Sequence, residues 1–250
     1  MTSNNNVKME DKIITLAAIM KKSKNIMILT GAGMDTESNI PDFRSRSGWW
    51  RNIDPREVAT REALKNNYSL FHDFYSYRIK KLFDVNPHKG HYVLAKFEEQ
   101  GIINSIATQN VSGLHRKAGS KEVYELHGNI NIVNCDDCKS DEDITNFLNR
   151  GSCEKCNSEF LRPRVILFGE SLPEEVWSKT LSNLNKIDLL IVIGTSLAVY
   201  PVNELPRMFN GFKVYINNEE SLNYNYFDLT IIGKAKDILI KLDEEISKSS

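Results

Sequence analysis

Apolar residues recur along the chain with two different spacings, which predict helices and strands in alternation. Ile13, Leu16 and Met20 recur at helical spacing, whereas residues 26–30 and 188–193 are short apolar runs typical of buried strands. The pattern predicts helices over residues 10–22, 69–84, 92–100, 174–186 and 235–246, and strands over residues 26–30, 102–108, 122–126, 164–168, 188–193 and 211–216. Strands that alternate with helices are typical of an α/β fold with a parallel sheet.

Composition limits the classes of protein that this chain can represent. Its 250 residues suffice for one large domain and a small module, at about 150 residues per domain. A net charge of −1 gives no support for nucleic-acid binding through bulk charge. No apolar run is long enough to span a bilayer, and residues 1–12 lack the apolar core of a secretory signal. We therefore expect a cytoplasmic monomer that binds neither a membrane nor nucleic acid directly.

The four cysteines form two identical spacings. Cys135-x2-Cys138 is followed after a short interval by Cys153-x2-Cys156. Two such turns can present four thiolates to one Zn²⁺ ion in a tetrahedral site. Two disulfides or a redox pair are the alternatives, but disulfides suit secreted proteins and a redox pair needs a single such turn. Four protein ligands leave no open position, so the predicted zinc is structural.

Two predicted strands end in glycine-containing turns. Residues 29–33 read LTGAG and residues 192–196 read VIGTS. In open α/β sheets ligands bind beyond the carboxyl ends of the strands, where glycine lets the backbone approach a phosphate. Thr36 stands where a full dinucleotide-binding fingerprint would have its third glycine, so this loop alone equally predicts a tight turn.

Several ordered segments together resemble one family, the sirtuins (Sir2 family) of NAD-dependent protein deacylases. Residues 31–44 resemble GAGxSxxSGIPDFR, 108–119 resemble TQNxDxLHxxAG, 125–128 read ELHG, 168–173 resemble FGExLP, 194–201 resemble GTSLxVxP, and 216–219 resemble INxE. The paired cysteine motifs lie between the third and fourth of these segments.

This resemblance implies an architecture and a set of sites. The fold would be a Rossmann-like parallel sheet with helices on both faces, a small zinc-ribbon module and a helical insertion. The implied division is an NAD-binding domain of residues 1–38, 86–129 and 161–250, a cofactor-binding loop and helical part of residues 39–85, and a zinc module of residues 130–160. The implied NAD-binding residues are Gly31, Ala32, Gly33, Thr36, Phe43, Arg44, Gln109, Val111, Ser112, Gly194, Thr195, Ser196, Asn217 and Lys234. Phe168, Gly169 and Glu170 would lie along an acyl-lysine peptide.

The implied reaction is removal of acyl groups from protein lysines, giving nicotinamide, free lysine and O-acyl-ADP-ribose. NAD is consumed as a co-substrate. His127 of the ELHG segment is the expected general base, because an imidazole titrates near neutral pH, and Gln109 and Asn110 are the other expected catalytic residues. NAD-dependent ADP-ribosyl transfer, NAD hydrolysis and a catalytically weak NAD-binding protein are the alternatives. We expect structural roles for the remaining histidines, with His72 on the surface.

Three positions depart from the family pattern. Asp35 stands where the family has Ser, Asn39 where it has Gly, and Ser112 where it has Asp. In the family that Asp holds the nicotinamide amide, so we expect Ser112 to weaken NAD binding or to alter sensitivity to nicotinamide. Tyr75-x2-Arg78 resembles the pair with which some sirtuins bind the carboxylate of succinyl- or malonyl-lysine, although an amphipathic helix would place the same residues there.

Overall fold

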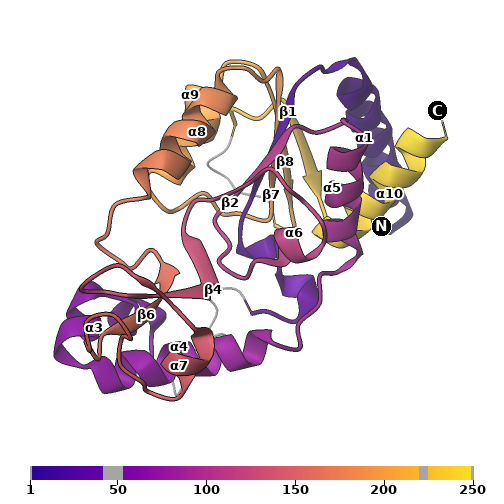
Figure 1. Ribbon diagram of the computed structural model, residues 1–250. Coiled ribbons are helices and arrows are strands. Elements are labelled where there is room, and N and C mark those ends of the chain that lie inside the picture. The colour runs from indigo at the N-terminus through magenta and orange to yellow at the C-terminus, as the bar shows by residue number, and fades with distance from the viewer. Residues whose placement is uncertain (1, 42–52, 220–224, 249–250) are drawn as a thin grey trace.

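The larger of two sheets organises the molecule. A computed structural model describes residues 2–41, 53–219 and 225–248. Six parallel strands lie in the order β3-β2-β1-β7-β8-β9 (Figure 1). They are β1 (Ile26–Thr30), β2 (Ser105–Thr108), β3 (Val123–Glu125), β7 (Leu189–Ile193), β8 (Phe212–Asn217) and β9 (Leu229–Ile232).

Both faces of this sheet are covered by helices, because its inner strands are apolar on both sides. Ile26 and Ile28 belong to one buried cluster, whereas Met27 and Leu29 belong to another. The alternation follows from the strand period of two. One face packs against α1 (Thr2–Lys22), α5 (Lys89–Glu99) and α10 (Ala235–Ser247), and the other packs against α8 (Glu174–Leu184) and α9 (Leu205–Met208) (Figure 1). The expected doubly covered parallel sheet is confirmed.

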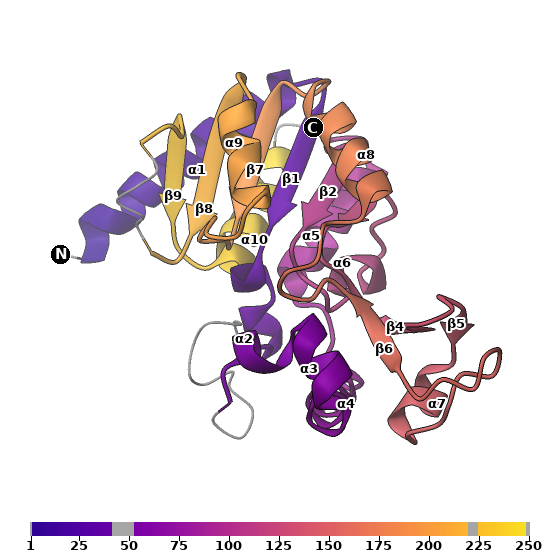
Figure 2. The same cartoon turned by 90° about the vertical axis from the view of Figure 1, so that its left-hand side faces the viewer.

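A smaller unit lies beyond the carboxyl ends of the large sheet (Figure 2). Its three strands are antiparallel, in the order β5-β4-β6, and β4 and β6 share a second apolar core with four helices. The elements are β4 (Gly128–Cys135), β5 (Asp141–Glu142), β6 (Leu161–Val165), α2 (Pro55–Val58), α3 (Arg61–Asn66), α4 (Tyr68–Leu82) and α7 (Ile144–Leu148). The short helix α6 (Leu114–Lys117) follows β2 in the large sheet.

Some local expectations were wrong. The strand expected over residues 164–168 is β6, which begins at Leu161 and pairs antiparallel with β4 instead of joining the large sheet. Strand β9 and helix α2 are not among the elements that the sequence pattern predicted. His72 is buried, with its Nε2 atom 2.6 Å from the carbonyl oxygen of Phe147, so it joins α4 to α7. Across the described ranges, no helix combines the length and the apolar character needed to cross a bilayer.

Candidate functional site

The predicted cofactor-binding segments follow neighbouring strands of the large sheet. Because β2, β1, β7, β8 and β9 are adjacent and parallel, their carboxyl ends lie along one edge. The residues that follow these ends are Gly31 to Thr36 after β1, Gln109 to Ser112 after β2, Gly194 to Ser196 after β7, Asn217 at the end of β8, and Lys234 after β9. The fold therefore gathers at one edge segments that lie far apart in sequence.

The glycine turns after β1 and β7 touch each other. The Gly33 N–H donates to the Gly194 carbonyl at 2.7 Å. A Cβ atom on Gly33 would lie 2.8 Å from the Gly194 Cα, and one on Gly31 would lie 2.5 Å from the Thr195 Cβ. Gly194 has a φ of +62°, a conformation that favours glycine. The glycines are thus required for the contact between the two loops.

Two amides from the loop after β2 fasten these turns. The Gln109 side chain donates to Thr195 Oγ1 at 2.9 Å, and the Asn110 side chain donates to the Gly31 carbonyl at 2.9 Å. Val111 packs against the core of the smaller unit. The loop from 109 to 111 therefore joins the ends of β1 and β7 to the second apolar core.

His127 lies in the turn between β3 and β4, where the chain passes from one sheet to the other. Its Nδ1 atom is 3.1 Å from the Gln109 carbonyl oxygen, which can only accept, so Nδ1 carries the proton and the neutral ring has its lone pair on Nε2. Burial lowers the pKa of His127 from its usual 6.5, and the bond to the carbonyl raises it by less. Gly128 is required beside it, since a Cβ there would lie 2.0 Å from the Arg164 carbonyl oxygen.

Sequence reasoning noted Asp35 and Ser112 separately and did not pair them. The Ser112 hydroxyl donates to Asp35 Oδ2 at 2.7 Å, and His91 Nε2 lies 3.1 Å from Asp35 Oδ1. All three side chains are buried. The signal that could have found this pair was its reciprocity, since Asp replaces Ser at one position and Ser replaces Asp at the other.

The segment expected to contact a peptide follows β6. Phe168 is 43% exposed, and its N–H donates to the Ala59 carbonyl at 2.9 Å. The carboxylate of Glu170 accepts from Arg162 at 2.7 and 2.9 Å and from the Leu167 N–H at 2.8 Å. Glu170 thus fixes the turn, and Phe168 beside it is partly exposed.

The Tyr75 and Arg78 side chains lie near each other on α4. Tyr75 is buried and Arg78 is half-buried, with its guanidinium 5.5 Å from the centre of the Phe74 ring. Burial raises the pKa of Tyr75 and lowers that of Arg78. The neutral Tyr75 hydroxyl can donate a hydrogen bond and the Arg78 guanidinium carries donors only, so the two could together bind a carboxylate.

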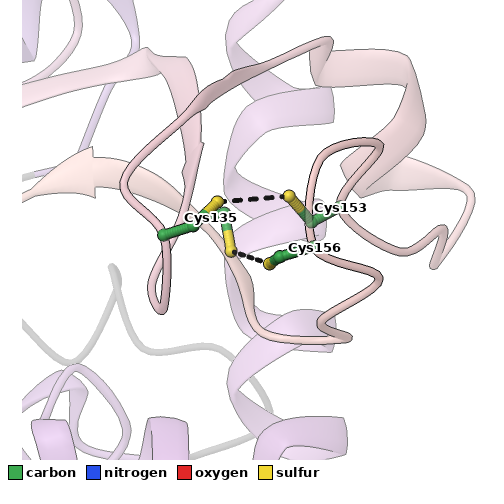
Figure 3. A group of neighbouring side chains, drawn as sticks. Cys135, Cys153 and Cys156 are labelled. Carbon is green, nitrogen blue, oxygen red and sulfur yellow. Dashed lines mark hydrogen bonds between the residues drawn. The ribbon is translucent and has the colours of Figure 1, made fainter.

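The four cysteines converge in the smaller unit. Their Sγ atoms all lie within 4.8 Å of one another, and the 135–156 and 138–153 pairs are 3.6 and 3.5 Å apart (Figure 3). Four thiolates around Zn²⁺ at about 2.3 Å have sulfurs about 3.8 Å apart, whereas a disulfide needs about 2.05 Å. Each turn ends in a residue of positive φ, Lys139 or Asn157, whose N–H donates to the first cysteine's carbonyl. The disulfide alternative is wrong, because the thiols are free.

The remaining predicted residues are placed as follows. Ala32 and Thr36 are half-buried in the turns after β1, and the Thr36 hydroxyl donates to the Gly33 carbonyl at 2.9 Å. Asn217 donates to the Tyr215 hydroxyl at 2.7 Å, while Ser196 and Lys234 are exposed along the same edge. Gly169 has a φ of +88°, and the position that a Cβ would occupy is open. Phe43 and Arg44 lie outside the described residues.

Comparison with known proteins gives consistent results. A model of the Sir2 family matches residues 31–201. The NAD-dependent protein deacylase 2 of Archaeoglobus fulgidus is 40% identical over 249 residues, which covers 96% of this chain and 98% of that protein. The NAD-dependent protein deacetylase of Oceanobacillus iheyensis is 42% identical over 217 residues, which covers 85% and 91%.

Two solved structures show the same fold. A Sir2 homologue in complex with NAD matches with a TM-score of 0.88 at 33% identity and covers 94% of both chains. A Sir2 protein bound to a myristoylated histone peptide matches with a TM-score of 0.79 at 34% identity and covers 96% of this chain and 98% of that one. The likeness extends over nearly the whole chain in both cases.

Proposed function

This chain belongs to the Sir2 family and is an NAD-dependent protein deacylase, and we propose that His127 is the general base of its reaction. The observation that carries the proposal is the bond between His127 Nδ1 and the Gln109 carbonyl. It fixes the tautomer with the lone pair on Nε2, so this atom can accept a proton from a ribose hydroxyl.

The edge formed by the carboxyl ends of β1, β2, β7 and β8 is the proposed NAD site. NAD supplies an electrophilic ribose carbon and nicotinamide as the leaving group. The glycine turns would hold the pyrophosphate through backbone N–H groups and hydroxyls, and Asn217 and Lys234 would lie toward the adenosine end. Gln109 and Asn110 would position the nicotinamide ribose, because their side chains already join the ends of β1 and β7.

The four-cysteine cluster fits a structural zinc ion. The sulfur separations match a tetrahedral thiolate site, and all four positions would be filled by the protein. Each thiol would lose its proton on binding the metal, so metal affinity would rise with pH. The ion would fasten the two turns to each other and to β4.

The substrate is an acyl-lysine peptide, and we place it along residues 168–170. The exposed Phe168 ring and the open space around Gly169 support this placement. Tyr75 and Arg78 are the proposed clamp for an acyl chain that ends in a carboxylate. The cytoplasmic location, the monomeric state and the absence of nucleic-acid binding stay predictions. The domain boundaries also stay predictions. Strand β6, which belongs to the second sheet, begins at residue 161, where the predicted NAD-binding domain resumes.

Mass spectrometry of reaction products tests the function directly. The protein would be incubated with NAD and matched acetyl-lysine and succinyl-lysine peptides, with His127→Ala as the control. We expect O-acyl-ADP-ribose and free lysine peptide from the wild type and neither from the variant. Free ADP-ribose or ADP-ribosylated protein without the acylated product would instead establish NAD hydrolysis or ADP-ribosyl transfer.

A further inference from the structure

Asp35 is a buried carboxylate at the edge where NAD is proposed to bind. It follows the glycine turn after β1, and its side chain is 6% exposed. Its bonds in the described part of the chain go to the Ser112 hydroxyl and to His91, and no lysine or arginine there forms an ion pair with it. The one ion-pair partner recorded for it is the His91 imidazole, so among the described residues this buried carboxylate has no permanently charged partner, which calls for an explanation.

Two further imidazoles, those of His88 and His115, do not supply a stable positive charge. His88 and His115 pack against His91, with ring centres 4.3 and 4.9 Å from it. Burial lowers the pKa of His88 and lowers that of His115 to about 3, so both are neutral at physiological pH. His91 donates through Nε2, which leaves one further acceptor position on each Asp35 oxygen, because a carboxylate can accept about four hydrogen bonds.

Asp35 lies at the reacting end of the proposed site. Its partner Ser112 follows Gln109 by three residues, and the Gln109 carbonyl contacts His127. Asn217 ends β8 and Lys234 follows β9, and these strands are two and three strands away from β1. At this end NAD offers two kinds of hydrogen-bond donor, the hydroxyls of the nicotinamide ribose and the N–H groups of the nicotinamide carboxamide. The nicotinamide ring of NAD is also cationic, which matches the charge of the carboxylate.

We propose that Asp35 binds the nicotinamide carboxamide. Asp35 and Ser112 form a pair in which the carboxylate belongs to the loop after β1, whereas the family pattern has it in the loop after β2. The inference rests on the proposed function. The reciprocal departures at these two positions support it, because the pair keeps one carboxylate and one hydroxyl in hydrogen-bond contact. Ser112 orients the carboxylate, and the expected loss of NAD affinity from Ser112 is offset by Asp35.

Calorimetric titration with NAD and with ADP-ribose, in the absence of peptide, tests this assignment. ADP-ribose lacks nicotinamide, so it reports every other contact. We expect Asp35→Asn to weaken NAD binding by about tenfold or more, as for a lost charge-assisted hydrogen bond, and to change ADP-ribose affinity by less than about twofold. Glu99→Gln removes an exposed carboxylate from α5 and should change neither affinity.

The exchanged pair provides the second variant. Asp35→Ser combined with Ser112→Asp should restore the ratio of NAD to ADP-ribose affinity to within about threefold of the wild type, whereas Asp35→Ser alone should lower it by about tenfold. Inhibition by free nicotinamide should weaken in Asp35→Asn and Asp35→Ser and recover in the double variant.

Two results would overturn the proposal. One is a folded Asp35→Asn protein whose affinities for NAD and ADP-ribose are both unchanged or fall in parallel. The other is a folded Asp35→Ser, Ser112→Asp double variant whose ratio of NAD to ADP-ribose affinity stays as low as that of Asp35→Ser alone. This second result decides the question even if Asp35→Asn does not fold. Failure of the deacylase assignment is separate, because it would appear as absence of O-acyl-ADP-ribose from the wild type.

Discussion

The His127 Nδ1 atom and the Gln109 carbonyl oxygen lie 3.1 Å apart, so the chain fixes the tautomer of its proposed base through a backbone group. We expect His127→Ala to lower kcat by about a hundredfold or more, as for loss of a general base. ADP-ribose affinity should be retained, which separates this effect from misfolding. A variant that keeps a tenth of the wild-type rate would contradict the assignment.

The pH dependence of the reaction follows from the same residue. The base must be neutral, and burial lowers the pKa of His127 below 6.5. The acidic limb of kcat/KM should therefore have its midpoint below 6.5, with a constant rate from pH 7 to pH 8. A profile of kcat/KM against pH checks this, and a midpoint above 7 would show that another group titrates.

Gly194→Ala tests the contact between the two glycine turns. The new Cβ would lie 2.4 Å from the Met34 nitrogen, and the φ of +62° costs a further 1–2 kcal/mol, approximately, in any residue with a Cβ. We expect loss of both NAD and ADP-ribose binding together with a lower melting temperature. Gly101→Ala is the control, since Gly101 also has positive φ but has open space around its Cβ position. Equal effects of the two variants on binding would rule out the loop contact as the cause.

The cysteine cluster predicts about one zinc ion per chain. Cys153→Ser should abolish zinc binding and lower the free energy of unfolding by on the order of 3–5 kcal/mol, because the metal holds the two turns together. Elemental analysis and urea unfolding measure the two effects. Ser152→Ala alters an exposed neighbour and should affect neither, and full stability of a zinc-free Cys153→Ser protein would exclude the structural role.

If Tyr75 and Arg78 form the proposed clamp, they favour peptides whose acyl chain ends in a carboxylate. Arg78→Ala should lower kcat/KM for a succinyl-lysine peptide by about tenfold or more relative to an acetyl-lysine peptide, the usual effect of losing a charge-assisted hydrogen bond. Tyr75→Phe should act in the same direction. Lys80→Ala changes an exposed cation on the same helix and serves as the control. If both peptides lose rate equally in Arg78→Ala, these residues do not form a clamp.

Arg162 couples the segment after β6 to the cysteine module. Its buried guanidinium contacts both Glu170 and Asp136. We expect Arg162→Met to cost about 3–5 kcal/mol, since it leaves two carboxylates without this partner. Arg164→Met removes an exposed ion pair with Asp141 and should cost about 1 kcal/mol or less. Urea unfolding at pH 7 compares them, and similar costs would contradict the coupling.

The same carboxylates make stability depend on pH. Burial raises the pKa of Asp136, but bonds from Arg61 and Lys65 outweigh it and lower that pKa to about 2. The pKa of Glu170 is also lowered, because bonds from Arg162 outweigh its burial. Their contribution to stability is present above the unfolded values of 3.8 and 4.5 and is lost as pH falls toward 2.

The parts of the fold that sequence predicted are those with a strong period or a specific motif. The buried runs of β1 and β7 and the spacing of the cysteines needed no tertiary information. Helix α2 is a single turn, too short for periodicity to reveal, and β9 is a short edge strand. Strand β6 was placed too late because Arg162 and Arg164 appear solvent-exposed in the sequence, although ion pairing buries Arg162.

The site could be predicted as motifs but not as contacts. His127 and the glycine turns were identified by their segments. The bond between Asp35 and Ser112 joins residues of different loops, and their separate departures from the pattern gave no measure of their distance. Only the adjacency of β1 and β2 brings them together.

The strand order also determines when each core can assemble during synthesis. The buried residues of the second core all lie between Val58 and Leu167, whereas the first includes residues as late as Ile246. Chains emerge from the ribosome from the N-terminus, and domains generally fold as units. The smaller unit is therefore the first to have all of its core residues synthesised. The central strand β1 gains its neighbour β7 only after Ile193 has been translated, so the edge proposed to bind NAD is among the last features to form.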